Sequence, residues 1–167
     1  MHARESDLMT RYARVLGAAI AAIEPLDAAS LRQPCAAERC SAAALASHIA
    51  AVQGATAGFV RAIVAGEPLP TLTMEDIDRN NAENAKRNDR LGKDEVITRL
   101  RAGGEAMTRV LQGLSEDDLA RTAPFTLFGG EVSVQTLVEQ AVINHTEQHL
   151  ASLQAAVGPE ARTSDNG

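Results

Sequence analysis

The sequence is nearly free of aromatic side chains. It has no Trp, and Tyr and Phe make up 2% of its 167 residues, namely Tyr12, Phe59, Phe125 and Phe128. A core without large rings is filled by Ala, Leu, Val, Ile and Met, and hydrophobic residues reach 45% of the chain, a share typical of globular proteins. Because small alanines let helices approach closely, this composition favours a helical bundle over a sheet sandwich.

The chain also lacks a basic tract and a long hydrophobic run. Its net charge is −6, and it has few cations to neutralise phosphates and few rings on which bases stack. These features argue against nucleic-acid binding and, for the same reason, against attachment to a membrane surface. The most apolar stretch, 16–23, is too short to span a bilayer. Residues 1–14 mix charges of both signs without a cleavable signal pattern, so we expect a cytoplasmic protein.

Cysteine is scarce. Cys35 and Cys40 bracket the segment 36–39, and the chain has no second Cys pair that would complete a metal site. A structural disulfide is unfavourable in a reducing cytoplasm. We therefore interpret the two cysteines as unpaired thiols near the junction of a loop and a helix.

Helical spacing of apolar residues dominates what is present. It predicts helices over 5–24, 41–65, 73–90, 93–113 and 133–157, with short turns at 27–32 and 115–119. Ser41, Ser115 and Ser133 are expected caps, and Thr73 with Asp76 resembles a capping box. The least helical segment is 122–131.

These elements predict an all-α protein, a four-helix bundle with a kinked or interrupted third helix. Leu91-Gly92 separates 73–90 from 93–113, so these segments form either one long kinked helix or two helices. The length fits one domain, which we place at 1–158, followed by a disordered polar tail at 159–167.

The chain shows a weak internal similarity. Leu26-Asp27-x3-Leu31 is similar to Leu114-Ser115-x3-Leu119, and Ser41-x3-Leu45 is similar to Ser133-x3-Leu137. Each half reads as a helix, a short turn, a loop and a Ser-capped helix. The match is either coincidence or the sign of a bundle built from two similar halves.

Three histidines are the candidate functional residues. His145 and His149 are four residues apart on one predicted helix, which places them on one face. Both belong to a predicted inward stripe with Val134, Val138, Ala141 and Ser152, and His48 belongs to another with Leu45, Val52, Ala55, Phe59 and Ile63. The fourth histidine, His2, lies near the N-terminus.

The His145-x3-His149 pair alone is weak, because helical pairs occur by chance and Thr146 stands where a zinc-protease motif needs Glu. Its alternative interpretation is a pair of partly exposed histidines. Burying three neutral imidazoles costs free energy unless each finds a partner. A divalent metal (zinc, nickel or iron) satisfies all three and keeps an open position.

Other polar residues are weaker candidates for a functional site. Asn81, Asn84 and Asn88 share a helix face that either lines a polar pocket or, as we favour, is solvated. Glu147 points away from His145 and is expected to be solvated.

Three stretches resemble the DinB-like superfamily, which includes YfiT-like metal hydrolases and the N-terminal domain of mycothiol-dependent maleylpyruvate isomerase. They are Cys40-Ser41-x6-His48, Leu114-Ser115-x3-Leu119 and Val142-Ile143-Asn144-His145-x3-His149-x4-Gln154. The resemblance implies a four-helix bundle, a divalent metal held by His48, His145 and His149, and a homodimer. The chain departs from the family at Cys40, where members often have Trp.

Some members of that family are thiol-dependent transferases or isomerases. The resemblance therefore implies a metal-dependent enzyme that joins a low-molecular-weight thiol to a small-molecule substrate or hydrolyses that substrate. Two alternatives stay open: a metal-stabilised binding or structural module without turnover, and a site that holds no metal.

Overall fold

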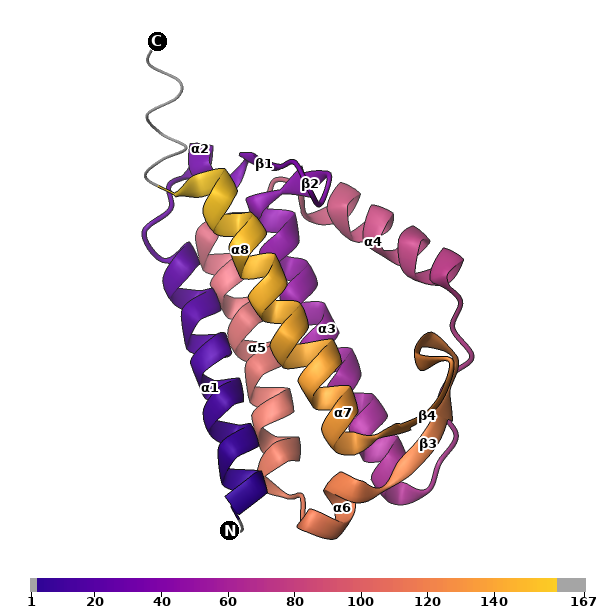
Figure 1. The fold of residues 1–167 in the computed structure, drawn as a ribbon. Helices are drawn as coiled ribbons and strands as arrows, with labels where there is room; N and C mark the ends of the chain where they lie inside the picture. The colour runs from indigo at the N-terminus through magenta and orange to yellow at the C-terminus, as the bar shows by residue number, and fades with distance from the viewer. Residues whose placement is uncertain (1–2, 159–167) are drawn as a thin grey trace.

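Four long helical segments form the bundle in the computed structural model, which describes residues 3–158 (Figure 1). They are α1 (Ala3–Ile23), α3 (Ala42–Ala65), α5 (Lys93–Gln112) and a last segment that runs through α7 (Val134–Val138), the π-helical η2 (Glu139–Asn144) and α8 (His145–Val157). The predicted all-α four-helix bundle is confirmed. The tail predicted at 159–167 lies outside the described residues.

The third predicted helix is interrupted rather than kinked. α4 (Met74–Asn88) lies outside the bundle and packs on α3, whereas α5 lies inside the bundle between α1 and α3 (Figure 1). Gly92, which precedes α5, has an extended backbone with φ −75° and ψ 160°. The alternative of one long kinked helix over 73–113 is wrong, because this extended residue redirects the chain completely.

The two halves of the chain repeat one order of elements. In the first half α1 is followed by α2 (Ala28–Leu31), a hairpin of β1 (Pro34–Cys35) and β2 (Cys40–Ser41), and then α3. In the second half α5 is followed by α6 (Glu116–Ala120), a hairpin of β3 (Thr122–Phe125) and β4 (Gly130–Ser133) joined by η1 (Thr126–Phe128), and then α7. The similarity of the halves is confirmed, although neither hairpin was predicted.

Each predicted cap forms its hydrogen bond. The hydroxyl of Ser41 accepts from the backbone N–H of Ala44 at 3.2 Å, and Ser133 caps α7 in the same way through Thr136 at 3.1 Å. Thr73 and Ser115 form capping boxes at the starts of α4 and α6. These bonds fix the first turns of the helices that carry the functional side chains.

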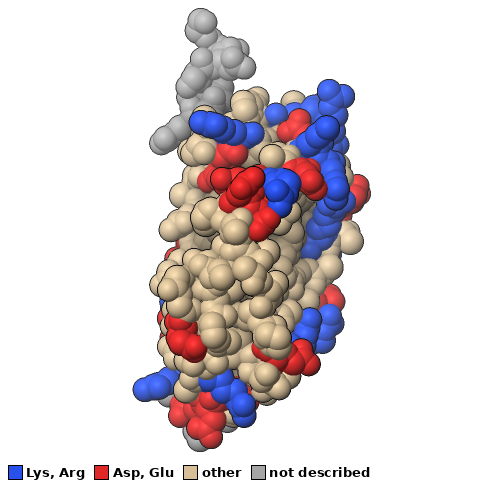
Figure 2. Space-filling view, turned by 90° about the vertical axis from the view of Figure 1, so that its right-hand side faces the viewer, with Lys and Arg blue, Asp and Glu red and all other residues tan. Residues whose placement is uncertain are grey.

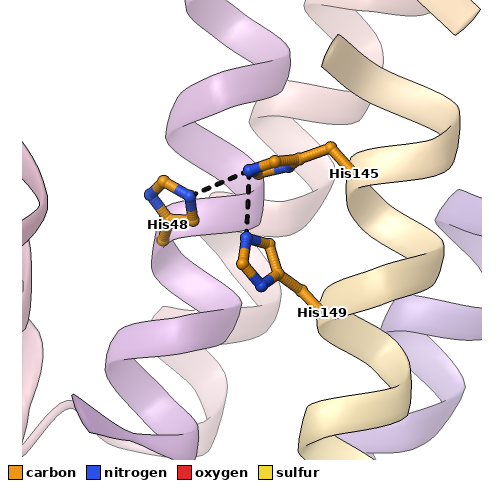
Figure 3. A group of neighbouring side chains, drawn as sticks. All are labelled: His48, His145 and His149. Carbon is orange, nitrogen blue, oxygen red and sulfur yellow. Dashed lines mark hydrogen bonds between the residues drawn. The ribbon is translucent and has the colours of Figure 1, made fainter. Parts of the chain in front are cut away.

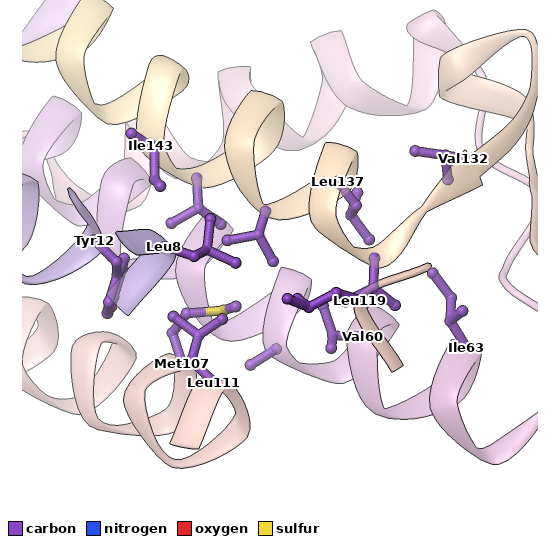
Figure 4. Packing of buried hydrophobic residues seen from close by; sticks show 14 of the residues in the cluster. Leu8, Tyr12, Val60, Ile63, Met107, Leu111, Leu119, Val132, Leu137 and Ile143 are labelled. Atoms are coloured by element: carbon purple, nitrogen blue, oxygen red, sulfur yellow. The ribbon is translucent and has the colours of Figure 1, made fainter. Parts of the chain in front are cut away.

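The core is aliphatic along its length. One cluster, drawn in Figure 4, joins Tyr12, Val60, Met107 and Leu137 with their neighbours at one end of the bundle. A second cluster at the other end contains Ile23, Leu45, Leu100 and Leu153.

Helix α3 is long and apolar enough to cross a membrane by length and composition, and 61% of its most apolar window is buried inside the bundle. The most apolar segment was predicted at 16–23 and instead lies in α3. Core helices pass the same test, and burial accounts for the composition of α3.

The predicted inward stripe of α3 is only partly correct. Leu45 and Ile63 are buried, but Val52 and Phe59 are half-buried and Ala55 is exposed. The buried face instead carries Ile49, Gln53, Thr56, Ala57 and Val60. On α8 the buried residues are Thr146, Leu150, Leu153 and Val157, so the histidines lie at the border of the core rather than at its centre.

Gly103 allows α3 and α5 to approach closely. A Cβ built at this position would lie 2.5 Å from the carbonyl oxygen of Ala50, which is a backbone atom that cannot move aside. We therefore expect Gly103→Ala to destabilise the protein by about 1–3 kcal/mol, the usual cost of overpacking.

The matched control is Gly54→Ala on α3, where an added Cβ meets no atom within 4 Å. Its free energy of unfolding should rise by up to about 1 kcal/mol, because Ala is the better helix former. Urea unfolding measures both variants. Equal effects of the two substitutions would contradict the role given to Gly103.

Candidate functional site

Three imidazoles meet between α3 and α8 (Figure 3). Nε2 of His145 lies 3.1 Å from Nε2 of His48 and 2.9 Å from Nε2 of His149. All three ligand atoms lie within 4.8 Å of one another. The structure thus brings together every histidine that the sequence singled out, and the arrangement fits a metal-binding site.

The last helical segment changes its winding just before this site. The π-helical segment η2 ends at Asn144, and α8 begins at His145. A π-helical turn holds more residues than an α-helical turn, so it rotates α8 relative to α7. This rotation turns His145 and His149 toward His48 while Val142 and Ile143 stay in the core.

Burial keeps two of the rings neutral. Desolvation, with a smaller contribution from the neighbouring His149, lowers the pKa of His48 to about 4 and that of His145 to about 3. At neutral pH both rings therefore carry a lone pair that can bind a cation. Nδ1 of His145 is buried without a hydrogen-bond partner among the described residues.

Glu38, which sequence reasoning missed, supports the third ring. Its Oε1 lies 3.0 Å from Nδ1 of His149 and accepts a hydrogen bond from the hydroxyl of Ser152, also at 3.0 Å. Glu38 lies in the turn between β1 and β2, where the following residue, Arg39, has φ 54° and the carbonyl of Cys35 accepts from both backbone N–H groups. No local pattern marks this residue, because its partner is 111 positions away.

Two cavities open beside the histidines. The first, of about 430 Å³, reaches His48 and His145 and is otherwise mostly apolar; we call it the apolar chamber. The second, of about 500 Å³, reaches His48 and His149 and has charged walls that include Glu38, Arg39 and Asp78; we call it the polar cavity. Space for a small molecule therefore exists on both sides of the site.

The asparagines of α4 are not a solvated face. The side-chain amide of Asn84 donates to the carbonyl of Ala44 at 3.0 Å, and that of Asn88 donates to Asn84 at 2.7 Å. Asn88 is buried and also accepts from Arg99. Asn81 is exposed, and with Asn84 it borders both cavities. These bonds hold α4 over the site.

Glu147 is exposed as predicted, and it forms an ion pair with Arg14 of α1 at 2.6 Å. It does not belong to the site.

A model of the DinB superfamily matches residues 11–153. The chain belongs to the DinB superfamily. This match covers the histidine site and nearly all of the bundle, and it confirms the resemblance inferred from the sequence. The chain matches no functionally curated protein and no solved structure. What this DinB-superfamily chain can do chemically therefore depends on the geometry of the site itself.

Cys35 and Cys40 are free thiols, as predicted, and they face each other across the β1–β2 hairpin. Burial, with smaller contributions that include the carboxylate of Glu38, raises the pKa of Cys35 to about 12 and that of Cys40 to about 11. Because the thiolate is the reactive form, both side chains are poor nucleophiles at neutral pH.

We expect both thiols to react with a chromogenic disulfide reagent at least about tenfold more slowly than free cysteine at neutral pH. Unfolding in urea should abolish the difference. The single variants Cys35→Ser and Cys40→Ser assign the two rates. A thiol in the folded protein that reacts as fast as free cysteine would contradict this account of the hairpin.

Proposed function

We propose that the protein is a divalent-metal-dependent enzyme that acts on a small molecule. The observation that carries the proposal is the convergence of three Nε2 atoms at a point bordered by two cavities. His48, His145 and His149 would hold the metal, which would be zinc, nickel or iron.

The spacing of the nitrogens supports this assignment. Bonds of about 2.0–2.1 Å in a tetrahedral site place two ligand nitrogens about 3.3 Å apart. The contacts of 3.1 and 2.9 Å are close to that separation. A small expansion of the cluster accommodates the ion without movement of the helices.

The chemistry follows from the number of protein ligands. Three ligands leave a position for a reactant, and a divalent metal supplies Lewis acidity that lowers the pKa of a water or thiol there. We favour a low-molecular-weight thiol that attacks an electrophilic small molecule, or hydrolysis of that molecule, as the reaction. Residues of the chain orient the reactants: Asn81 and Asn84 border the site from α4, opposite the histidines.

A purely structural metal is the weaker alternative. A structural ion is closed in by protein ligands, whereas the cavities leave this site accessible from two sides. We also propose that the protein forms a homodimer, as the family resemblance implies, that it is cytoplasmic, because residues 1–14 carry no cleavable signal pattern, and that it has no nucleic-acid or membrane partner.

The metal proposal predicts about one equivalent of divalent metal per chain in the purified protein. His145→Ala should lower metal affinity most, because Nε2 of His145 contacts both other rings. Gln148→Ala, an exposed neighbour on α8, is the control and should bind as the wild type does. Elemental analysis and competition with a chelator measure both. Unchanged metal content in His145→Ala would refute the assignment.

Glu38 generates a second prediction. By accepting the Nδ1 proton it keeps the Nε2 lone pair of His149 free for the metal, so Glu38→Ala should lower metal affinity about ten- to a hundredfold. Glu38→Gln, which retains an acceptor oxygen, should have an intermediate effect. The Co²⁺ spectrum of each variant reports the change in ligand field independently of activity.

Ser152→Ala is the matched control, since it removes the other contact of Glu38 and leaves the bond to His149. If Glu38 only fastens the hairpin to α8, Glu38→Ala and Ser152→Ala will lower the melting temperature alike and leave metal affinity unchanged. That result would remove Glu38 from the site.

A further inference from the structure

We propose that the apolar chamber binds the uncharged hydrocarbon part of the substrate, a chain or ring, and presents its polar reacting group to the three histidines. This inference names the substrate class and rests on the proposed function for its chemical role. The chamber is bounded by α3, α4, the β3–β4 hairpin and the last helical segment.

The lining of the chamber selects against charge. Among the described residues that line it there is no Asp, Glu, Lys or Arg, and its polar groups are the two histidines, Thr56 and three asparagines of α4. Its volume of about 430 Å³ lies within the usual range for small-molecule sites. A charged group that moved from water into this chamber would lose its hydration, and no side chain of opposite charge would compensate for the loss.

The scarce aromatic residues gather here. Phe59, Phe125 and Phe128, three of the four Tyr and Phe residues in the chain, line the chamber. Phe125 contacts Phe59 edge-on with ring centres 5.2 Å apart and stacks with Phe128 at 5.9 Å. Apart from Tyr12, which is buried in the core, the large rings of the bundle thus line the chamber, where they offer broad apolar contact to a ligand.

The mouth of the chamber is apolar as well. Met74 is 64% exposed and Phe128 is 37% exposed, and they are the large hydrophobic side chains that stand out on the described surface. Both line the chamber. Figure 2 shows an uncharged area across the middle of this face, with charged residues gathered toward its two ends. An apolar molecule therefore meets mainly apolar side chains between the surface and the two histidines, His48 and His145.

Hydrogen bonds hold the α4 side of the chamber in place. Asn84 and Asn88 hold the C-terminal part of α4 on α3. At the other end, the hydroxyl of Thr126 accepts from the backbone N–H of Leu72 at 3.0 Å and donates to its carbonyl at 2.6 Å. These bonds hold α4 and the segment before it over the chamber, so the binding of a ligand requires little ordering of the protein.

The polar cavity and the apolar chamber suit different parts of the reactants. Its walls include Glu38, Arg39 and Asp78, so hydrocarbon gains little by entering from that side. The apolar part of a substrate therefore occupies the chamber, and polar groups or a hydrophilic co-reactant occupy the other side of the histidines.

A series of unbranched alkyl hydroxamic acids, from acetohydroxamic to octanohydroxamic acid, tests the proposal on Zn²⁺-loaded protein by calorimetry. The hydroxamate group binds the metal at every length, and only the alkyl tail varies. We expect affinity to rise about fourfold per added methylene until the chamber is filled. Nile red, a neutral fluorophore without a metal-binding group, should bind the metal-free protein, and its emission should rise in the apolar chamber.

Ala55→Phe fills the chamber about two helical turns from His48. It should abolish the dependence on tail length and the binding of Nile red, and leave acetohydroxamic acid unaffected. Ala102→Phe is the matched control, because Ala102 is also an exposed helical alanine and does not line the chamber. If Ala55→Phe fails to fold, Met74→Glu serves as a second variant. It places a charge at the mouth and should weaken the binding of hydroxamic acids with long tails.

The outcomes separate the two proposals. Equal affinity for all tails in the wild type would overturn the chamber proposal and leave the metal site standing. No hydroxamate binding to protein that holds Zn²⁺ would overturn the open site, while loss of Nile red binding in Ala55→Phe alone would still support the chamber. Affinity for long tails that falls as protein concentration rises would show that a second copy covers the mouth, which overturns the chamber proposal.

Discussion

The contact among three imidazoles is the constraint on which the rest of the site depends. A neutral imidazole has one N–H and one lone pair. When Nδ1 of His149 donates its proton to Glu38, a neutral His149 presents a lone pair at Nε2. Nε2 of His145 faces two other Nε2 atoms, and no placement of one proton per ring turns both contacts into hydrogen bonds. A cation shared by the three nitrogens resolves this conflict, whereas three buried lone pairs without one are costly.

The repeated halves of the fold supply the two sides of this site. The hairpin of the first half carries Glu38 to His149, and the hairpin of the second half contributes Phe125 and Phe128 to the chamber. α4 joins the halves and lies over the gap between them (Figure 1). Equivalent positions in the repeat thus serve different purposes: one hairpin supports a histidine of the candidate metal site, and the other forms part of the chamber wall.

The features that the sequence predicted correctly depend on local patterns. Ser41 and Ser133 cap helices through bonds within one turn, and His145 and His149 share a face because they are four residues apart. Glu38 and the asparagine anchors were missed because each depends on contacts between distant segments, and the hairpins were missed because their strands are only two to four residues long. The stripe of Val52, Ala55 and Phe59 was assigned to the core although it lines the chamber. Periodicity identifies an apolar face and does not tell whether protein or a cavity lies against it.

That misassigned stripe explains how one helix serves both stability and function. On one side of α3, Ala50 approaches Gly103 so closely that no side chain fits between the helices, which fixes the position of α3 against α5. On the opposite side, small and half-buried residues leave the chamber open. The packing of α3 on α5 holds the backbone of His48, and the His48 side chain reaches the chamber on the opposite side of the helix. Because this packing restrains the backbone of α3, the fold itself sets the position of His48 beside the chamber.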